Sequence, residues 1–151
     1  MGTRLKTIPV IDLFAGPGGL SEGFSSVETD DGNPRFDVRI SIEKDEQAHQ
    51  TLLLRALFRA FPKGEAPVCY YQYIRGEITR EKLFENPDIQ EELKLAKSEA
   101  KLAELGTTAS STTDGWIKQA LEGVEDWALI GGPPCQAYSL AGRARMKGLA
   151  E

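Results

Sequence analysis

Apolar and polar positions follow two different periods along the first half of the chain. Thr7–Phe14 is almost continuously apolar, whereas Phe36–Glu43 alternates apolar with polar residues, so both segments are predicted to be strands. A helix is predicted after each of them. The first begins near the cap residue Ser21, and the second begins after the cap residue Asp45 and stops at Pro62.

Two further apolar runs extend the strand pattern. Pro67–Ile74 is rich in β-branched and aromatic residues and is predicted to be the third strand, and Trp127–Gly132 is predicted to be the fourth. Strands that alternate with helices at such short spacing are joined by crossover connections, which make the strands parallel. The pattern therefore predicts an α/β fold.

The stretch between the third and fourth predicted strands is longer than the other connections. A helix is predicted to start at Asn86, with Pro87 at its first position, and to close at Gly106. Polar residues dominate 107–115, which predicts a mobile loop, and a short helix is expected around 116–121. We thus expect a helical insertion over residues 86–121. Its apolar stripe, at helical spacing, consists of Ile89, Leu93, Ala96, Ala100 and Ala103.

The composition narrows the class of protein. A chain of 151 residues is long enough for one domain, and none of its apolar runs approaches the roughly 20 residues that cross a bilayer. Two cysteines form no disulfide framework, so a cytoplasmic location is expected. The net charge of -5 argues against contact with nucleic acid over most of the surface, although it leaves room for a local basic patch. The single histidine, His49, and the absence of clustered ligands predict no metal site.

A glycine-rich turn follows the first predicted strand, in the stretch DLFAGPGGL. Glycines at this place let the backbone turn tightly and approach a ligand. The dinucleotide pattern G-x-G-x-x-G is incomplete, because Gly16 and Gly18 are followed by Ser21 where the third glycine would stand. An adenosyl ligand without phosphates fits this turn as well as a dinucleotide or better. A tight turn without a ligand remains the alternative.

Two acidic residues are candidates for holding a nucleoside. Glu43 ends the second predicted strand, where a carboxylate in nucleoside-binding α/β folds accepts hydrogen bonds from both ribose hydroxyls. Glu77 follows the third predicted strand and is the matching candidate to accept from an adenine amino group. Both positions are also compatible with an ordinary charged surface.

The stretch GGPPCQAYS frames a cysteine after the fourth predicted strand. Two prolines fix the approach to Cys135, and a basic run that includes Arg143, Arg145 and Lys147 follows it. These cations can raise the local potential and contact phosphates. Cys69 lies in an apolar run without a polar frame and is expected to be an inert core residue. The frame favours a reactive Cys135 over a structural one.

The glycine turn and the framed cysteine, in this order, resemble the N-terminal half of the cytosine-C5 DNA methyltransferase family. DLFAGPGGL is similar to that family's S-adenosylmethionine motif, and GGPPCQAYSLAGR is similar to its catalytic Pro-Cys-Gln motif. The resemblance implies the first half of a Rossmann-like methyltransferase fold, with parallel strands in the order 3-2-1-4 and helices on both faces. Residues 1–151 would then be the N-terminal part of one catalytic domain, in a cytoplasmic enzyme of bacterial or phage origin.

The resemblance also assigns roles to individual residues. Cys135 would be the nucleophile, and Glu43 would hold the ribose, with Lys44 beside the adenine where many members have a larger apolar residue. Glu77 and Ile78 would lie at the adenine edge. The other residues expected to line the cofactor are Phe14, Ala15, Gly16, Gly18, Gly19, Leu20 and Pro133, and those expected at the DNA are Gln136, Ser139, Arg143 and Arg145.

The implied reaction is transfer of a methyl group from S-adenosylmethionine to C5 of a cytosine flipped out of double-stranded DNA, leaving S-adenosylhomocysteine. The Cys135 thiolate would add to C6, because C5 of cytosine is a poor nucleophile without such an adduct. The family's later motifs and its target-recognition domain are expected beyond residue 151. We therefore expect a fragment with little activity alone, and an open sheet edge that favours self-association.

Three other functions are compatible with these residues. A branch of the same family methylates transfer RNA with much of this motif set. A nicotinamide- or flavin-dependent oxidoreductase can share the half-fold, although the framed cysteine has no role in it. A non-catalytic remnant acting through the helix at 86–105 is the third alternative.

Overall fold

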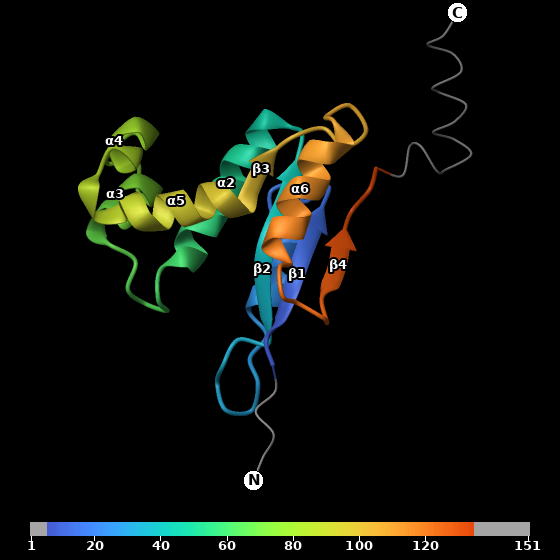
Figure 1. Cartoon of the computed structure of the whole chain (residues 1–151). Helices are drawn as coiled ribbons and strands as arrows, with labels where there is room; N and C mark the ends of the chain where they lie inside the picture. The colour runs from blue at the N-terminus through green and yellow to red at the C-terminus, as the bar shows by residue number, and fades with distance from the viewer. Residues whose placement is uncertain (1–5, 135–151) are drawn as a thin grey trace, which may run out of the picture.

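Residues 6–134 are described by the computed structural model, and they form a parallel sheet surrounded by helices (Figure 1). The sheet has four strands in the order β3-β2-β1-β4, and every neighbouring pair is parallel. The predicted α/β architecture and the predicted strand order are therefore confirmed. The strands are β1 (Ile8–Leu13), β2 (Phe36–Glu43), β3 (Ala100–Leu102) and β4 (Ala128–Gly131).

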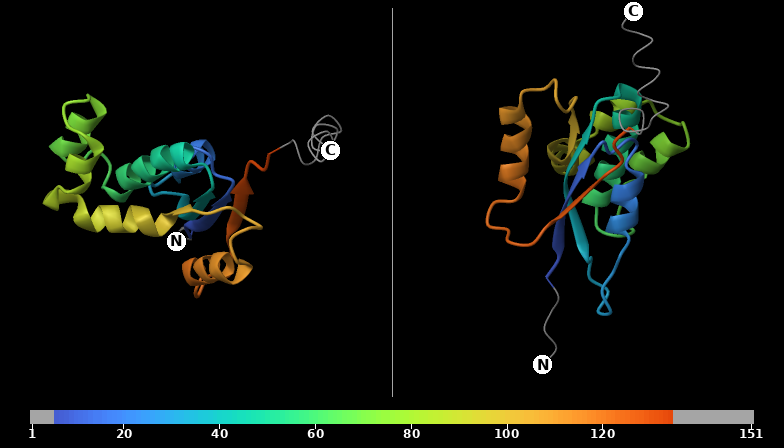
Figure 2. Two further views of the ribbon diagram at one scale, coloured as in Figure 1. Left: turned by 90° about the horizontal axis from the view of Figure 1, so that it is seen from above. Right: turned by 90° about the vertical axis from the view of Figure 1, so that its right-hand side faces the viewer.

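Helices cover both faces of the sheet, as Figure 2 shows. On one face lie α1 and α2, and α6 lies on the other. The remaining helices extend from α2 as a separate helical layer (Figure 1). The helices are α1 (Gly19–Ser25), α2 (Glu46–Ala60), α3 (Val68–Ile74), α4 (Arg80–Phe84), the 3₁₀ turn η1 (Pro87–Ile89), α5 (Gln90–Glu99) and α6 (Ser110–Ala120).

Two apolar clusters hold these layers together. The larger one joins α2 to the helical layer, with Leu52, Leu57 and Leu83 fully buried at its centre. The smaller one lies between the sheet and α6, where Trp116 and Ile117 pack against buried Ile11 and Ile42. Burial of these side chains is the main favourable term for both contacts, at about 1.5–3 kcal/mol for each large residue.

The segment predicted to be the third strand is instead the helix α3. Within Pro67–Ile74, Cys69 and Tyr70 are buried while Val68 and Ile74 are exposed, which is a helical rather than an alternating pattern. Pro67 takes the position before the first helical residue, and Tyr70 stacks on Phe58 of α2 at 5.2 Å between ring centroids. Packing on α2 thus overrides the strand propensity of this segment.

The third strand comes from the segment predicted to be a helical insertion. Asn86 caps the start as expected, but the helix ends at Glu99 rather than at Gly106, and Ala100–Leu102 pairs with β2. Residues 86–121 are therefore not an insertion in the sheet but the connection that supplies its edge strand. The predicted stripe is buried at four positions, which are Ile89, Leu93, Ala96 and Ala100.

The predicted loop over residues 107–115 is also wrong, because Ser110–Ala120 forms α6. The segment is polar since only one face of the helix meets the sheet. The residues of this face that pack against the buried isoleucines of the sheet are Trp116, Ile117 and Ala120. The short helix expected around residues 116–121 is the second half of this longer one.

Candidate functional site

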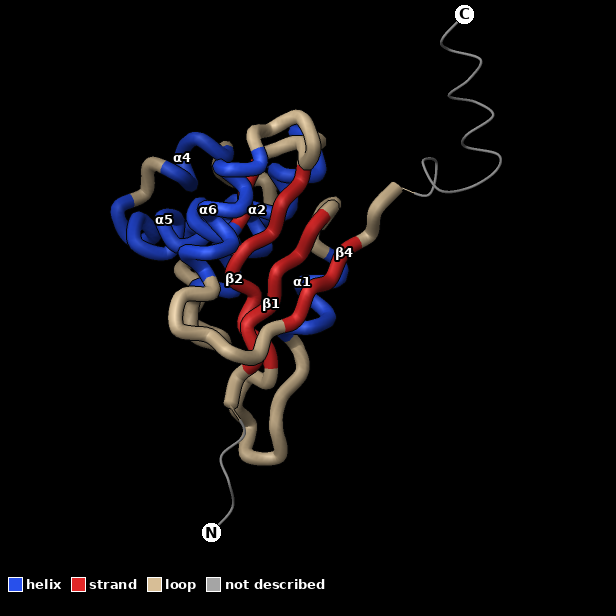
Figure 3. Tube along the Cα trace, turned by 45° about the vertical axis from the view of Figure 1, so that its right-hand side comes forward, coloured by secondary structure: helices blue, strands red, loops and turns tan. Residues whose placement is uncertain are grey.

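Three turns meet at the carboxyl edge of the sheet. They are the turns after β1, β2 and β4. These turns are neighbours because β1 lies between the other two strands (Figure 3). Leu13, the last residue of β1, is paired with Ile42 of β2 on one side and with Gly131 of β4 on the other. The predicted adjacency of the first and fourth strands is confirmed. Ligands of open α/β sheets bind at such an edge, where the strand order reverses.

The turn after β1 carries an unusual backbone. Phe14 has φ of 57°, and it is the one non-glycine residue with a positive φ in the range 6–134. This conformation costs on the order of 1–2 kcal/mol for a bulky residue, and such strain clusters at functional sites. A Cβ atom added at Gly16 or Gly19 would meet no described atom within 4 Å, so the backbone of the turn faces open space. The turn can therefore be approached closely by a ligand.

The same turn is seated on α2. A Cβ atom at Gly18 would lie 2.9 Å from a methyl carbon of Leu52, and Arg55 donates a hydrogen bond to the Pro17 carbonyl oxygen at 3.0 Å. Gly18, with φ of 87°, is also the residue before the first turn of α1. The backbone angle favours glycine here, and any other residue would also displace the Leu52 side chain.

Glu43 connects the turn after β1 with the turn after β2. Its Oε2 accepts a hydrogen bond from the Gly16 N–H at 2.8 Å. Its Oε1 accepts from the N–H groups of Lys44 and Asp45, at 2.8 and 2.7 Å. A carboxylate has about four acceptor positions, so capacity for a hydroxyl donor remains. Glu43 therefore fixes the shape of the turn and keeps acceptor capacity for a ligand hydroxyl.

A buried polar cluster beneath this turn escaped the sequence analysis. Ser21, predicted to cap α1, is instead inside the helix, and its hydroxyl donates to Oδ2 of Asp12 at 2.6 Å. Ser41 of β2 lies 3.3 Å from the same hydroxyl, and all three residues are fully buried. Burial raises the pKa of Asp12, and its Oδ1 has no partner among the described residues. The available signal was a carboxylate inside the apolar run of the first strand.

Glu77, which was expected to follow the third strand, follows a helix instead. Glu77 follows the helix α3, where it pairs with Arg75 at 3.0 Å, and the Ile78 side chain packs in the helical layer. The acidic and apolar pair that follows the third strand is Glu104-Leu105. Leu105 packs against the sheet, and Ala103 donates a hydrogen bond to the Glu43 carbonyl oxygen at 2.9 Å.

Lys44 and Glu104 form an ion pair across the ends of β2 and β3. The Lys44 ammonium lies 2.9 Å from Oε1 of Glu104, and both side chains are about half exposed. The hydrogen bond between them raises the pKa of Lys44 and lowers the pKa of Glu104. Lys44 thus faces β3 beside the predicted ribose site.

The glycine pair of the second motif has a steric explanation. A Cβ atom on Gly131 would lie 2.1 Å from the Leu13 carbonyl oxygen, which no real contact allows, whereas one on Gly132 would lie 3.9 Å from the Phe14 carbonyl oxygen. Gly131 therefore lets β4 approach β1 at the edge. Pro133 is exposed just beyond it. The predicted residues Cys135, Gln136, Ser139, Arg143 and Arg145 lie outside the described range.

The structure also places the other groups that the sequence singled out. His49 contacts the Ala100 carbonyl oxygen through Nε2, and residues 6–134 contain no group of three potential metal ligands and no helix able to span a membrane. Cys69 is buried, and burial raises its pKa, as expected for an unreactive thiol.

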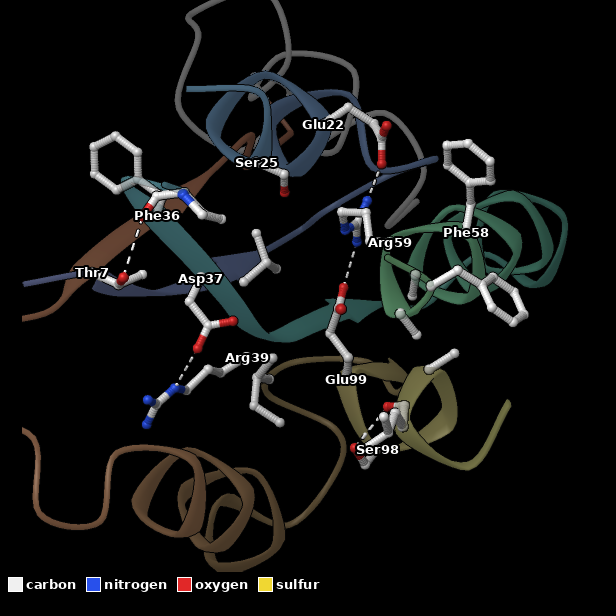
Figure 4. Close-up of a pocket in the computed structure, with 18 of the residues that line it drawn as sticks. Thr7, Glu22, Ser25, Phe36, Asp37, Arg39, Phe58, Arg59, Ser98 and Glu99 are labelled. Carbon is white, nitrogen blue, oxygen red and sulfur yellow. Dashed lines mark hydrogen bonds and ion pairs between the residues drawn. The ribbon is translucent and has the colours of Figure 1, made fainter. Parts of the chain in front are cut away.

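A large cavity lies away from the carboxyl edge, and no residue of the glycine turn lines it. It has about 1230 Å³ and lies beside the amino half of β2, between α1, α2, α5 and α6 (Figure 4). Arg59 of α2 crosses it and pairs with Glu22 of α1 and Glu99 of α5 (Figure 4). Burial raises the pKa of Glu99, and the guanidinium opposes this effect. These ions tie three helices together.

Two known proteins are similar to this chain. It is 33% identical over 154 residues to a type II methyltransferase of Bacillus paralicheniformis, an alignment that covers 91% of this chain and 33% of that protein. It is 29% identical over 149 residues to a putative type II methyltransferase of Oceanobacillus iheyensis, covering 99% of this chain and 23% of that protein. The chain thus spans about a third or less of these relatives. No family model matches the chain, and no solved structure matches it significantly.

Proposed function

We propose that this chain forms the cofactor-binding part of an S-adenosylmethionine-dependent methyltransferase that acts on cytosine in DNA. Two observations of different kinds support the proposal. Both relatives are named type II methyltransferases. The carboxyl edge brings together an open glycine turn, the acidic residue that ends β2 and the strand that leads to the Pro-Pro-Cys motif.

The observation that carries the proposal is the parallel pairing of β1 with β4. Because Leu13 is paired with Gly131, the glycine turn and the segment before Cys135 leave the sheet at adjacent points. A methyl donor held at one turn and a nucleophile after the other would then share one edge. Proximity of this kind is a large part of catalysis in group transfer.

The residues of the edge fit an adenosyl cofactor. The open space in front of Gly16 and Gly19 forms a cradle that any side chain at these positions would fill, and Glu43 keeps an acceptor for a ribose hydroxyl. We propose Glu104-Leu105, in place of Glu77-Ile78, at the base. Ala15 is buried, so only its backbone can face the ligand. The other proposed contacts are Phe14, Gly18, Leu20, Lys44 and Pro133.

The cofactor would supply a methyl group activated as a sulfonium. The Cys135 thiolate would add to C6 of the cytosine and move the ring electrons toward C5, which then accepts the methyl group. Loss of the C5 proton and departure of the thiolate restore the aromatic ring and the free cysteine. Gln136, Ser139, Arg143 and Arg145 are proposed to contact the DNA.

Ligand binding by the chain itself tests the first half of this proposal. S-adenosylhomocysteine at about 100 times its dissociation constant should stabilise the fold by about 2.7 kcal/mol, or roughly 5–10 °C in Tm, and NAD should not. Glu43→Ala should abolish the shift. The matched control is Glu46→Ala, at an exposed position in the first turn of α2. A shift with NAD but not with S-adenosylhomocysteine would favour an oxidoreductase.

A covalent trap tests the second half in a longer protein that contains this chain. DNA with 5-fluorocytosine cannot lose the C5 substituent as a proton, so the cysteine adduct should persist on a denaturing gel. Cys135→Ser should remove the adduct and Cys69→Ser should retain it. Trapping on RNA but not on DNA would move the substrate to the transfer-RNA branch, and absence of any adduct would favour a non-catalytic remnant.

A further inference from the structure

We propose that Lys44 determines the base specificity of the cofactor site, by donating a hydrogen bond to a ring nitrogen of a 6-aminopurine while Glu104 accepts from the amino group. The inference rests on the proposed function, because it concerns the adenosyl end of the same cofactor. It assigns a ligand contact to an ion pair that would otherwise be a surface feature.

The order of the strands places the base. Along the carboxyl edge, β4 and β1 carry the Pro133 segment and the glycine turn, β2 carries Glu43, and β3 is the next strand outward. In an adenosyl sulfonium the ribose stands between the methionine part and the base. If Glu43 holds the ribose and the glycine turn faces the methionine part, the base extends toward β3. Lys44 and Glu104 pair with each other at that end.

The chemistry of the pair matches one edge of adenine. The 6-amino group is a hydrogen-bond donor, and each ring nitrogen next to it, N1 or N7, is an acceptor. A carboxylate supplies only acceptors and an ammonium only donors, so Glu104 and Lys44 are complementary to these two neighbouring atoms. A 6-oxopurine presents an acceptor in place of the amino donor, and it would face the Glu104 carboxylate unfavourably. Leu102, 48% exposed at the end of β3, adds apolar surface nearby.

The pair can serve a ligand without being dismantled. Lys44 has three N–H donors and directs one of them at Oε1 of Glu104. Both side chains are largely solvated, so their mutual attraction is weak and their geometry can adjust. The bland alternative is an ion pair that only ties two turns together. Lys63 and Glu28 form such a pair at 2.8 Å, beside the cavity at the other end of β2.

Calorimetry with cofactor analogues distinguishes the two roles. The ligands are S-adenosylhomocysteine, its 1-deaza and 7-deaza analogues, and S-inosylhomocysteine, titrated into the wild type, Lys44→Met and the control Lys63→Met. The wild type should prefer the adenosyl over the inosyl ligand at least about tenfold, and one deaza analogue should bind about tenfold more weakly. In Lys44→Met that deaza penalty should disappear, while Lys63→Met should behave as the wild type.

The possible outcomes distinguish a failure of the proposed function from a failure of the role of Lys44. A wild type that binds none of the adenosyl ligands refutes the proposed function. Binding of S-adenosylhomocysteine with equal affinity for both deaza analogues, or a deaza penalty that survives in Lys44→Met, refutes the role of Lys44 alone. A gain of affinity in Lys44→Met also refutes it, because Lys44 would then only compete for Glu104. Equal melting curves for the two methionine variants show that folding is not the cause.

Discussion

Replacement of Gly131 by alanine tests the contact that joins the two motifs. The added Cβ atom would lie 2.1 Å from the carbonyl oxygen and 3.1 Å from the carbonyl carbon of Leu13, and contacts under 3.0 Å essentially never occur. Relief requires the strands to separate by roughly an ångström. β1 cannot move away easily, because it is hydrogen-bonded to β2 on its other side. The end of β4 must therefore leave its register.

The magnitude follows from what is lost. Overpacking of this kind costs about 1–3 kcal/mol, and each ladder hydrogen bond lost at the end of β4 adds about 1 kcal/mol. The φ angle of Gly131 lies outside the positive range, so alanine brings no backbone strain and the penalty is steric. We expect a loss of about 2–3 kcal/mol from a total of about 5–15 kcal/mol. For a chain of this size, Tm should fall by roughly 5–10 °C.

Gly132→Ala is the matched control. Its Cβ atom would lie 3.9 Å from the nearest described atom, which is an ordinary contact distance, so this variant should be as stable as the wild type or slightly more stable. Urea unfolding followed by circular dichroism and by tryptophan fluorescence measures both, and Trp127 reports directly on the start of β4. Stabilities of the two variants within about 0.5 kcal/mol of each other would refute the steric explanation.

Two further predictions concern the core and the sheet edge. Asp12→Asn should raise the free energy of unfolding at pH 7 but not at pH 4. Burial raises the pKa of Asp12, so above about pH 3.9 the Asp12 carboxyl group ionises in the unfolded wild type while it stays protonated in the folded state. The wild type therefore loses stability as the pH rises, and asparagine, which cannot ionise, does not. A stability difference between Asp12→Asn and wild type that stays constant from pH 4 to pH 8 in urea titrations would contradict this. The outer edge of β4 has no strand partner within residues 6–134 and exposes Leu129 at 58%, so the 151-residue chain should self-associate at high concentration. Light scattering should show that Leu129→Lys lowers this association, while Leu95→Lys, at an equally exposed position on α5, leaves it unchanged; a monomeric wild type would refute the prediction.

The central strands could be predicted because their sequence signals are local. β1 and β2 are set by apolar runs that end at a glycine turn and at a charged stretch, and Asp45 accepts the Ala48 N–H as a cap should. β4 ends at two glycines and two prolines. In these cases the residues that form the element also carry its boundaries, and no distant contact is needed to place it.

The edge strand could not be predicted in the same way. β3 has three residues, and the first of them, Ala100, continues the apolar stripe of α5, so the segment has the pattern of one more helical turn. It is a strand because Ala100–Leu102 can complete hydrogen bonds with Ser41–Glu43, a contact across about sixty residues of sequence. Because the third strand is β3 and its predicted segment is the helix α3, the acidic residue that follows the third strand is Glu104 and not Glu77. The buried Asp12 cluster depended likewise on packing between β1, α1 and β2.

Arg59 links the helices that flank the carboxyl edge. Its guanidinium pairs with Glu22 of α1, which starts at the glycine turn, and with Glu99 of α5, which leads into β3. The glycine turn and the end of β3 are thus connected through these ion pairs as well as through the strands of the sheet. Loss of these two ion pairs would let the glycine turn and the end of β3 move apart, although Arg59 itself lies beside the amino half of β2 and not at the carboxyl edge.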